Sequence, residues 1–455
     1  MDQVTGMLSR QEIAFAEKCL EMALGKGAGE VRITLNKSLM ELFGTLNGNL
    51  DKVSHCLDRS MNISLFVDGR YGSFSTNRLA EDELDGFLDK SISTVRMLAE
   101  DLFRALPDPG RTADDASAGT ELGLLDKSYA ALTADERLRK AMDAAIFKKH
   151  EGEDLISEEG EYSDSIFDSL ILDSNGTMCR HTETSFEYGV EATILDKEGN
   201  RYSGYWWDSS PMLERLDSGA CGENALARAR AQAGPVKIPG GNYTMVVDSE
   251  KASRLVNPLL NALNAYSLQQ NNSFLLDSLG KQVFPEWLSI MDQPREAGRI
   301  GSRLFDSEGV ATKEAPIIEN GVVMEYFVNT YMSNKMGIAP TIEDATRPVL
   351  LPCSDGRVAD PGSLDRKGIM ELVGDGILVT GFNGGNSNSA TGDFSFGIEG
   401  FLFKDGDVVH PVREMLITGN LQELWNNLIV AGNDSRLCMS KLIPTLAFSN
   451  VSFSS

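Results

Sequence analysis

Histidine and cysteine, common as catalytic bases, nucleophiles and metal ligands, are few and scattered in this sequence. Four histidines occur among the 455 residues, and six cysteines stand apart without a CxxC pair. A local zinc-protease motif needs two histidines one helical turn apart beside a glutamate, as in HExxH. His150-Glu151 begins such a pattern, but no second histidine follows it. The sequence therefore predicts no local zinc motif, and free thiols in a reducing compartment.

Residues 381–401, GFNGGNSNSATGDFSFGIEGF, join a glycine- and asparagine-rich half to an alternating aromatic half. The first half predicts a flexible loop, and the alternation of Phe394, Phe396 and Ile398 predicts a strand. Phosphate-binding loops lead into a helix and usually carry a lysine, whereas this segment has no lysine and leads into a strand. A serine nucleophile needs a base, and the GxSxG elbow is absent. Phosphate binding and a serine triad are therefore disfavoured.

The charge of the chain argues against several classes of partner. Its 67 acidic and 42 basic residues give a formal net charge of −25, which repels nucleic-acid phosphates and anionic membranes. No apolar run approaches the roughly 18 residues of a membrane helix, and the N-terminus lacks the pattern of a signal peptide. We therefore expect a cytoplasmic protein that binds neither nucleic acid nor membrane directly.

Turn signals and apolar periodicity predict an α+β fold in three parts. Residues 1–108 form an N-terminal α+β subdomain of helices and antiparallel hairpins. Residues 109–234 form a second α+β subdomain, and residues 235–455 form a strand-rich mixed domain. Capping boxes at Ser9 and Thr133 predict two of the helix starts.

Three further local features bear on the arrangement of the parts. The clearest boundary is Gly234-Pro235, followed closely by more proline and glycine. The consecutive tryptophans, Trp206-Trp207, are better explained as a strand end packed between domains than as a ligand platform. Near the C-terminus, LQELWNNLIV at residues 421–430 predicts a helix.

The C-terminal block resembles a known family. TGFNGGNSNSATGDFSFGIEGFLF and the following HPVREMLITGNLQELWNNL are similar to the C-terminal signature of the PmbA/TldE branch of the TldD/TldE proteins. These proteins are also called modulators of DNA gyrase, or U62 peptidases. Weaker similarity covers SFLLDSLGKQVFPEWLSIMDQP and GSRLFDSEGVAT, and the sequence before Gly234 fits the family in length and pattern.

The resemblance implies a TldD/TldE heterodimer that acts as a zinc metalloprotease on unfolded or small peptides. In the TldD-like chain, an HExxxH helix and a cysteine near the C-terminus hold the zinc and leave one position for water. Here VNPLLN, residues 256–261, takes the place of HExxxH. Val256 cannot ligate zinc, the amide of Asn257 cannot act as a general base, and Asn261 is at best a weak neutral ligand. Pro258 suggests that the helix starts or is kinked there.

Cys438 falls near the position of the partner's ligand cysteine, but without two histidines it is interpreted as a buried thiol. The resemblance therefore implies a subunit with no catalytic residue, metal or cofactor of its own, inactive alone. Zinc is expected in a TldD-like partner. This chain would shape a shared peptide channel and stabilise the partner, or form a homodimer in the partner's absence.

The signature loop is the candidate functional segment of this chain. We expect residues 383–393 to line a peptide channel or a partner contact, through Asn383, Gly384, Gly385, Asn386, Asn388 and Asp393. Two alternatives stay open. One is a stand-alone homodimer that binds peptides, and the other is a metal-independent hydrolase that uses serine or acidic residues of this loop.

Overall fold

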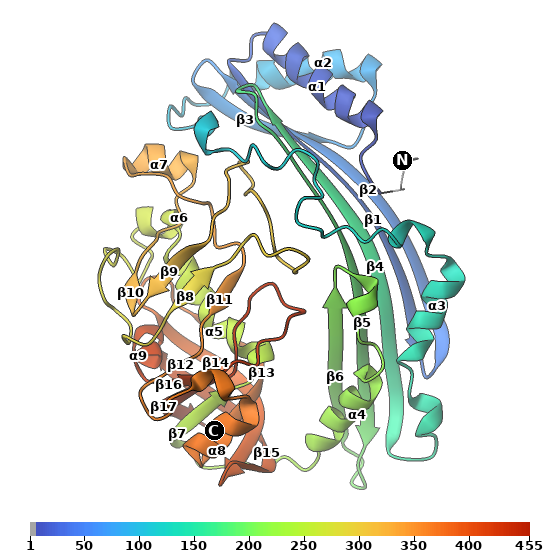
Figure 1. Cartoon of the computed structure of the whole chain (residues 1–455), viewed down its shortest axis with the longest axis vertical. Helices are drawn as coiled ribbons and strands as arrows, with labels where there is room; N and C mark the ends of the chain where they lie inside the picture. Colours follow the sequence, from blue (N-terminus) through green and yellow to red (C-terminus); the bar gives the residue numbers. More distant parts are fainter. Residues whose placement is uncertain (1–5) are drawn as a thin grey trace.

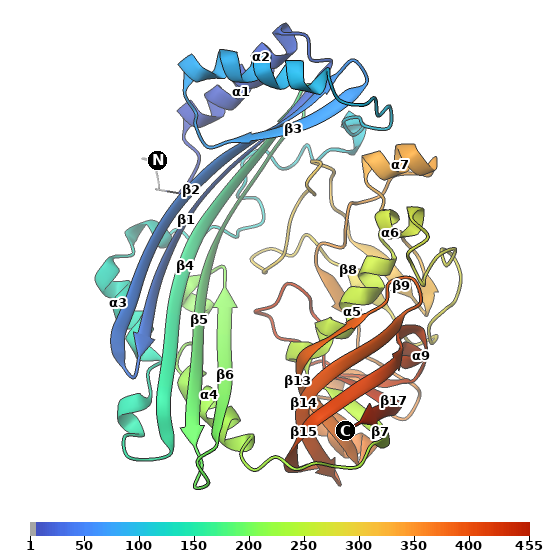
Figure 2. The same ribbon diagram turned by 180° about the vertical axis from the view of Figure 1, so that it is seen from behind.

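Long alternating segments of the N-terminal half form six antiparallel strands. The computed structural model describes residues 6–455, in which these strands pair in the order β3-β2-β1-β4-β5-β6. Figures 1 and 2 show them as a curved wall along one side of the molecule. Their bounds are β1 Glu30–Leu46, β2 Asn49–Val67, β3 Arg70–Thr76, β4 Leu155–Asp173, β5 Met178–Leu195 and β6 Arg201–Ser210.

Residues 1–108 and 109–234 contribute to this one sheet. β1 lies between β2 and β4, and its register with β4 runs from Arg32 opposite Asp173 to Leu46 opposite Glu159. The two segments therefore share a continuous hydrogen-bonded surface.

Four helices pack on one face of the long sheet. Two lie over its upper end in Figure 1 and two over its lower end. The capping boxes predicted at Ser9 and Thr133 are confirmed, because each side chain accepts a hydrogen bond from the backbone of the glutamate three residues on. The bounds are α1 Arg10–Gly25, α2 Glu81–Val95, α3 Ala134–Asp143 and α4 Cys221–Ala231.

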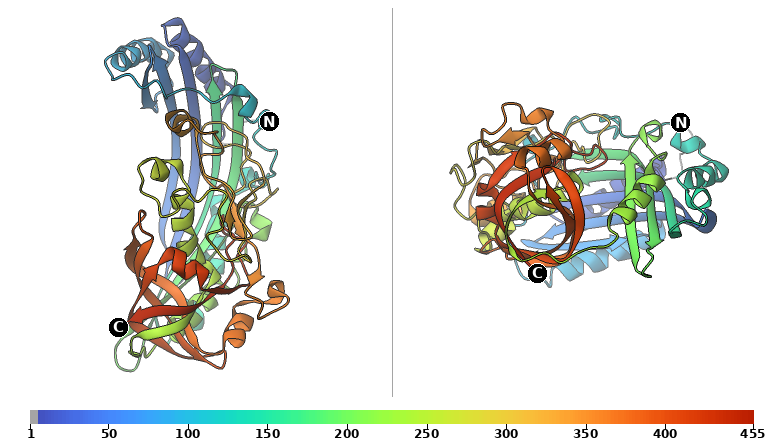
Figure 3. Two further views of the ribbon diagram at one scale, coloured as in Figure 1. Left: turned by 90° about the vertical axis from the view of Figure 1, so that its left-hand side faces the viewer. Right: turned by 90° about the horizontal axis from the view of Figure 1, so that it is seen from below.

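The C-terminal half contains a closed barrel. β7, β13, β14, β15 and β17 follow one another in a ring because β17 also pairs with β7, and Figure 3 (right) shows this ring end-on. Helix α5 (Ser249–Ala262) follows β7 and shares the barrel's apolar core. The strand bounds, with β16 and β12 beyond β17, are β7 Gly241–Val247, β12 Cys353–Ser354, β13 Gly376–Ser387, β14 Asp393–Lys404, β15 Asp407–Asn420, β16 Leu428–Ala431 and β17 Leu446–Ser454.

A smaller sheet of order β10-β9-β8-β11 completes this half, and the chain between β8 and β9 contacts the N-terminal half. Ala113 donates a backbone hydrogen bond to Gly309 at 3.0 Å, and Arg295 pairs with Asp115 at 2.6 Å. The remaining bounds are β8 Ile290–Asp292, β9 Ala315–Glu319, β10 Val322–Val323, β11 Pro348–Leu350, α6 Ala265–Gln269, α7 Thr330–Met336, α8 Arg366–Val373 and α9 Leu421–Asn426.

The helices and mostly antiparallel sheets confirm the α+β class, but two local predictions are wrong. The helix expected over 421–430 ends at Asn426, because the apolar run Leu428–Ala431 pairs with β17 as β16. The flexible loop expected in the first half of 381–401 is largely strand. β13 continues to Ser387 through a bulge and leaves a short turn before β14. Within residues 6–455, no helix has the length and apolarity to cross a membrane.

Candidate functional site

A large cleft lies between the long sheet and the barrel. Its volume is about 1360 Å³, above the roughly 300–1,000 Å³ of ordinary small-molecule pockets. β6 and α4 form one wall. α5, β13 and β14 form the other, with the chain before α8 and before β17. Both halves contribute walls, and the volume leaves room for an extended chain as well as for a small molecule.

Helix α5 directs a polar row into this cleft. Asp248 caps the helix by accepting a hydrogen bond from the Glu250 backbone at 3.1 Å. The apolar face of α5 is buried in the barrel core, so residues three apart on the opposite face reach the cleft. These are Lys251, Arg254 and Asn257.

The three positions aligned with zinc-motif residues have different surroundings. Val256 is 0% exposed in the apolar core. The side-chain oxygen of Asn257 accepts a hydrogen bond from the Lys441 ammonium, and burial lowers the pKa of Lys441 despite the opposing charge of Asp344. Asn261 lies at an exposed position of α5.

Pro258 lies inside α5, which begins at Ser249. Of the two expected alternatives, a helix start or a kink at the proline, the start is therefore excluded. In a helix interior, proline removes the hydrogen bond to the carbonyl four residues earlier, here that of Arg254. The capped first turns and the buried apolar face hold the helix in spite of this loss.

A zinc ion does not fit these residues. Val256 has no lone pair, and the oxygen of Asn257 already binds a cationic group. Burial raises the pKa of the Cys438 thiol to about 11, which opposes the thiolate that zinc requires. Across residues 6–455, no group of three or more His, Cys, Asp or Glu side chains is arranged to hold a metal.

A carboxylate between two arginines joins the two halves at the cleft. Glu250 of α5 accepts hydrogen bonds from both terminal nitrogens of Arg228 on α4, at 2.8 and 2.9 Å. It also accepts one from Arg436 at 2.8 Å. Arg436 in turn donates to the backbone oxygen of Trp207. We call Arg228, Glu250, Arg436 and Trp206 the interdomain clasp.

Trp206 lies within reach of both guanidinium groups of the clasp. Its ring centroid is 4.2 Å from the Arg228 Cζ and 4.5 Å from the Arg436 Cζ, within the range of cation–π attraction. Burial acts to raise the pKa of Glu250, but hydrogen bonding by Arg228 and the charges of both arginines hold it below its usual range. The carboxylate therefore stays charged at neutral pH.

α5 also touches the signature segment. Arg254 donates from Nη2 to the backbone oxygen of Gly385 at 3.2 Å, and its Cζ lies 4.9 Å from the centroid of the Phe396 ring. This contact holds a cation at the cleft wall where β13 bulges.

The six candidate residues of the signature segment fall into two groups. Gly384 lines the cleft, and Gly385 presents its carbonyl to Arg254. Asn383 lies within 3.5 Å of Glu399, another cleft residue. The Asn386 side chain accepts a hydrogen bond from the next backbone amide at 2.9 Å. The bulge thus places Gly384 at the cleft wall, with Asn383 and Gly385 in contact with the cleft residues Glu399 and Arg254.

Asn388 and Asp393 form the second group and close the turn at the far end of the hairpin. The Asn388 amide donates to the Asp393 carbonyl at 2.7 Å, and the Asn388 side chain accepts from Ala390 at 2.9 Å. The Asp393 carboxylate accepts from Thr391 at 2.8 Å and from Asn420 at 3.1 Å. These contacts give both residues a role in shaping the turn.

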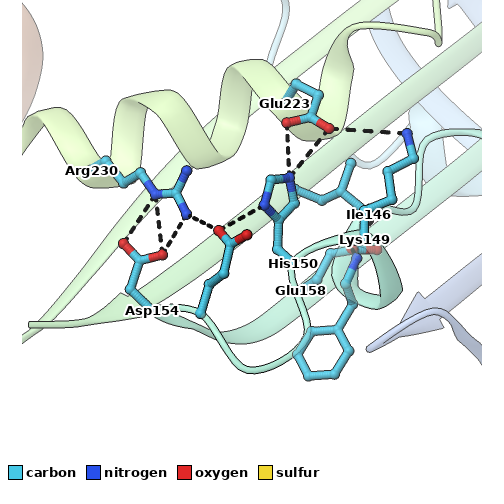
Figure 4. A network of polar contacts seen from close by, with 9 residues as sticks. Ile146, Lys149, His150, Asp154, Glu158, Glu223 and Arg230 are labelled. Atoms are coloured by element: carbon cyan, nitrogen blue, oxygen red, sulfur yellow. Dashed lines mark hydrogen bonds and ion pairs between the residues drawn. The ribbon is translucent and has the colours of Figure 1, made fainter.

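His150 belongs to a polar network at the lower end of the long sheet (Figure 4). Its ring nitrogens lie 3.0 Å from Glu153 and 3.1 Å from Glu223 of α4, and Arg230 reaches Glu153 at 2.8 Å. The hydrogen bond with Glu153 raises the pKa of His150. The network ties α4 to the chain entering β4, away from α5.

Sequence reasoning placed Trp206-Trp207 between domains, which the clasp confirms, but it missed Arg228, Glu250 and Arg436. The partners come from separate segments, and no local spacing marks them. The tryptophan pair was the available signal, although it lies inside β6 and not at the end of a strand as expected.

Comparisons with known proteins agree with this architecture. Residues 114–233 match the PmbA/TldA metallopeptidase central domain, and residues 240–455 match the C-terminal domain of the same family. The Haemophilus influenzae metalloprotease PmbA homolog is 28% identical, covering 93% of this chain and 91% of that protein. Metalloprotease PmbA of Escherichia coli O157:H7 is 26% identical over 94% and 93%.

Solved structures extend the likeness over the whole chain. A crystal structure of a candidate modulator of DNA gyrase from Bacteroides thetaiotaomicron superposes with a TM-score of 0.93. It is 38% identical and covers 99% of this chain and 100% of its own. TldE from Thermococcus kodakarensis shares the fold, with a TM-score of 0.81 at 17% identity over 97% and 100%. The chain therefore belongs to the PmbA/TldD metallopeptidase family.

Proposed function

We propose that this chain is the TldE-like, non-catalytic subunit of a cytoplasmic zinc metalloprotease that cleaves unfolded or small peptides. The observation that carries the proposal is the chemistry of α5. Where the resemblance places the histidines and glutamate of HExxxH, the helix offers the buried Val256, the lysine-bound Asn257 and the exposed Asn261. A TldD-like partner would supply the zinc.

The cleft supports a role in holding the peptide. Its walls come from both halves, and Arg254 and Lys251 of α5 add positive charge to a strongly acidic chain. Backbone groups of the β13 bulge, such as those of Gly384, lie at the same wall. An extended peptide can hydrogen-bond to such backbone groups whatever its side chains.

The decisive experiment compares this chain, a TldD-like protein from the same cell and their mixture. We expect cleavage of an unfolded peptide by the mixture, little by either protein alone, and zinc in stoichiometric amount only with the TldD-like chain. Size-exclusion chromatography with light scattering should show a complex of the two. Stoichiometric zinc in this chain alone, with cleavage stopped by a chelator, would overturn the proposal.

A stand-alone homodimer that binds peptides is the second candidate, because residues of this chain form both walls of the cleft. Peptide binding by the isolated chain, with no association to any TldD-like protein, would favour it. Peptide binding only by the complex would favour the first.

A further inference from the structure

The first part of β2 is a free sheet edge. Residues 49–60 pair with β1 on one side, while β3 pairs with β2 only from Met61 to Val67. Within residues 6–455, no other strand or isolated bridge meets the outer side of residues 49–60. Figure 2 shows β1 and β2 continuing well beyond β3. Along these twelve residues, the backbone donors and acceptors of alternate residues point outward and have no strand partner.

This edge also carries exposed apolar side chains. Val53 is 55% exposed and Leu57 is 50% exposed, although their cross-strand neighbours Phe43 and Leu39 are buried. Natural sheets protect long free edges, because an unpaired apolar edge readily pairs with another strand. The exposure of Val53 and Leu57 is explained if another strand pairs with this edge.

The sequence of residues 50–60 is complementary to a second, antiparallel copy of itself centred on His55. Lys52 then stands opposite Asp58, and Val53 stands opposite Leu57. Two copies placed antiparallel about this point would form two Lys–Asp pairs and two Val–Leu pairs. Opposite charges and apolar pairs directly across two strands are stabilising.

The centre of this symmetry matches the length of the free edge. His55 lies in the middle of residues 49–60, so a second copy's residues 50–60 would face residues 60–50 of the first. The added strand would end where β3 begins at the level of Met61. Because Thr76 of β3 already pairs with Met61, the second copy must leave the edge before its Asn49, and the contact is limited to residues 50–60.

We propose that this chain pairs with a second copy of the same chain through residues 50–60 of β2, antiparallel and with the two-fold axis at His55. The two long sheets become one continuous sheet across the axis. This isologous contact satisfies the free backbone groups and covers Val53 and Leu57 in both copies.

The intramolecular partners of the charged residues leave room for this contact. Lys52 lies 3.1 Å from Glu161 of β4, but its side chain remains 57% exposed. Asp58 is exposed on the same strand. A second copy's Asp58 can therefore join the Lys52–Glu161 pair.

Cysteine cross-linking tests the register in the full-length chain. All variants carry Cys56→Ser to remove the native thiol at this edge. Two chains with different affinity tags are prepared, one with Val53→Cys and the other with Leu57→Cys. Opposed residues of an antiparallel pair have Cα atoms about 4.5–5.5 Å apart, within disulfide range. We expect a rapid disulfide between the two variants when mixed, and little within either variant alone.

Charge exchange tests the same contact without cross-linking. Lys52→Glu and Asp58→Lys should each weaken dimerisation about tenfold in analytical ultracentrifugation, since each creates two like-charge pairs. The double variant should restore it. Met97→Lys, at another exposed apolar position, is the control and should leave the dimer unchanged.

The result that overturns the proposal is a wild-type chain that stays monomeric, or a double variant as weak as the single ones. Equal cross-linking of Val53→Cys with itself would overturn the register. The measurements use the chain alone and no peptide cleavage, so their outcome is independent of the proposed subunit role.

Discussion

Glu250 is the residue on which the contact between the two halves depends. Its side chain is 6% exposed and binds two arginines, one from each half of the molecule. An ion pair this buried contributes little net stability over an apolar replacement, but removing one partner leaves the others uncompensated.

Replacing Glu250 with alanine should lower the free energy of unfolding by about 2–4 kcal/mol. Arg228 and Arg436 would then lie close together beside Trp206, with no carboxylate to balance their charges. Urea denaturation followed by tryptophan fluorescence measures this change. Glu399→Ala, an exposed carboxylate in the same cleft, is the control and should change stability by less than about 1 kcal/mol. Equal effects would contradict the role given to the clasp.

Asp306 provides a pH-dependent prediction at the same scale. Burial, aided by the charge of Glu308, raises its pKa to about 6. Since the unfolded value is about 3.9, the folded chain holds this proton more tightly, and the contribution to stability falls as pH rises from 4 through 6. The stability of wild type minus that of Asp306→Asn should therefore drop by about 2–3 kcal/mol between pH 4 and pH 7. Urea titrations at both pH values check it, and a rise would contradict it.

At the scale of elements, the β13–β14 hairpin owes its shape to glycine. Gly385 has a φ of 84°, and a Cβ there would collide with the Ser395 carbonyl on β14. The bulge between Phe382 and Gly385 turns the backbone toward α5, where Arg254 meets it. The segment is therefore shaped strand rather than free loop.

Asn386 and Asn388 separate a channel role of this hairpin from a structural one. Asn388→Ala removes an acceptor for the Ala390 amide and should lower the free energy of unfolding by about 1 kcal/mol. Asn386→Ala, whose side chain bonds only its own neighbour among the described residues, should leave stability unchanged. If the segment lines a peptide channel or a partner contact, both should reduce complex formation or cleavage by the mixed subunits several-fold. Unchanged assembly and cleavage in both variants would leave the segment a purely structural role.

At the scale of the molecule, the two halves meet on both sides of the cleft. On one side, the clasp joins α4 to α5, and the chain between α4 and β7 connects the halves at the lower end of Figure 1. At the other end, Arg104 stacks on Tyr331 at 3.7 Å and Ala113 bonds to Gly309. Two separate contacts hold the width of the cleft more firmly than a single hinge would.

A peptide bound in the cleft should protect strands of both halves at once. We expect slower amide hydrogen exchange in residues 203–206 of β6 and 378–384 of β13 when an unstructured peptide is added to the subunit complex. The free edge at residues 49–60 is the internal control, because it lies outside the cleft lining. Protection confined to one wall would contradict a peptide held between them.

Local patterns were enough to predict the α+β class, the capped helix starts and the family. They also showed that α5 lacks the histidines of a zinc-binding HExxxH motif. They failed where tertiary pairing overrode local preference. Residues Leu428–Ala431 form strand because β17 offers them a partner, and β13 extends to Ser387 because β14 pairs with it.

The sequence by itself determined which groups this chain can bring to chemistry, because side-chain identity alone decides that Val256 is not a zinc ligand and Asn257 is not a general base. The tertiary structure alone decided which residues meet at the cleft and which edge is left open. Glu250 and Arg436 are 186 residues apart in sequence, and contacts at such separation depend on how the two halves pack, which no local spacing encodes.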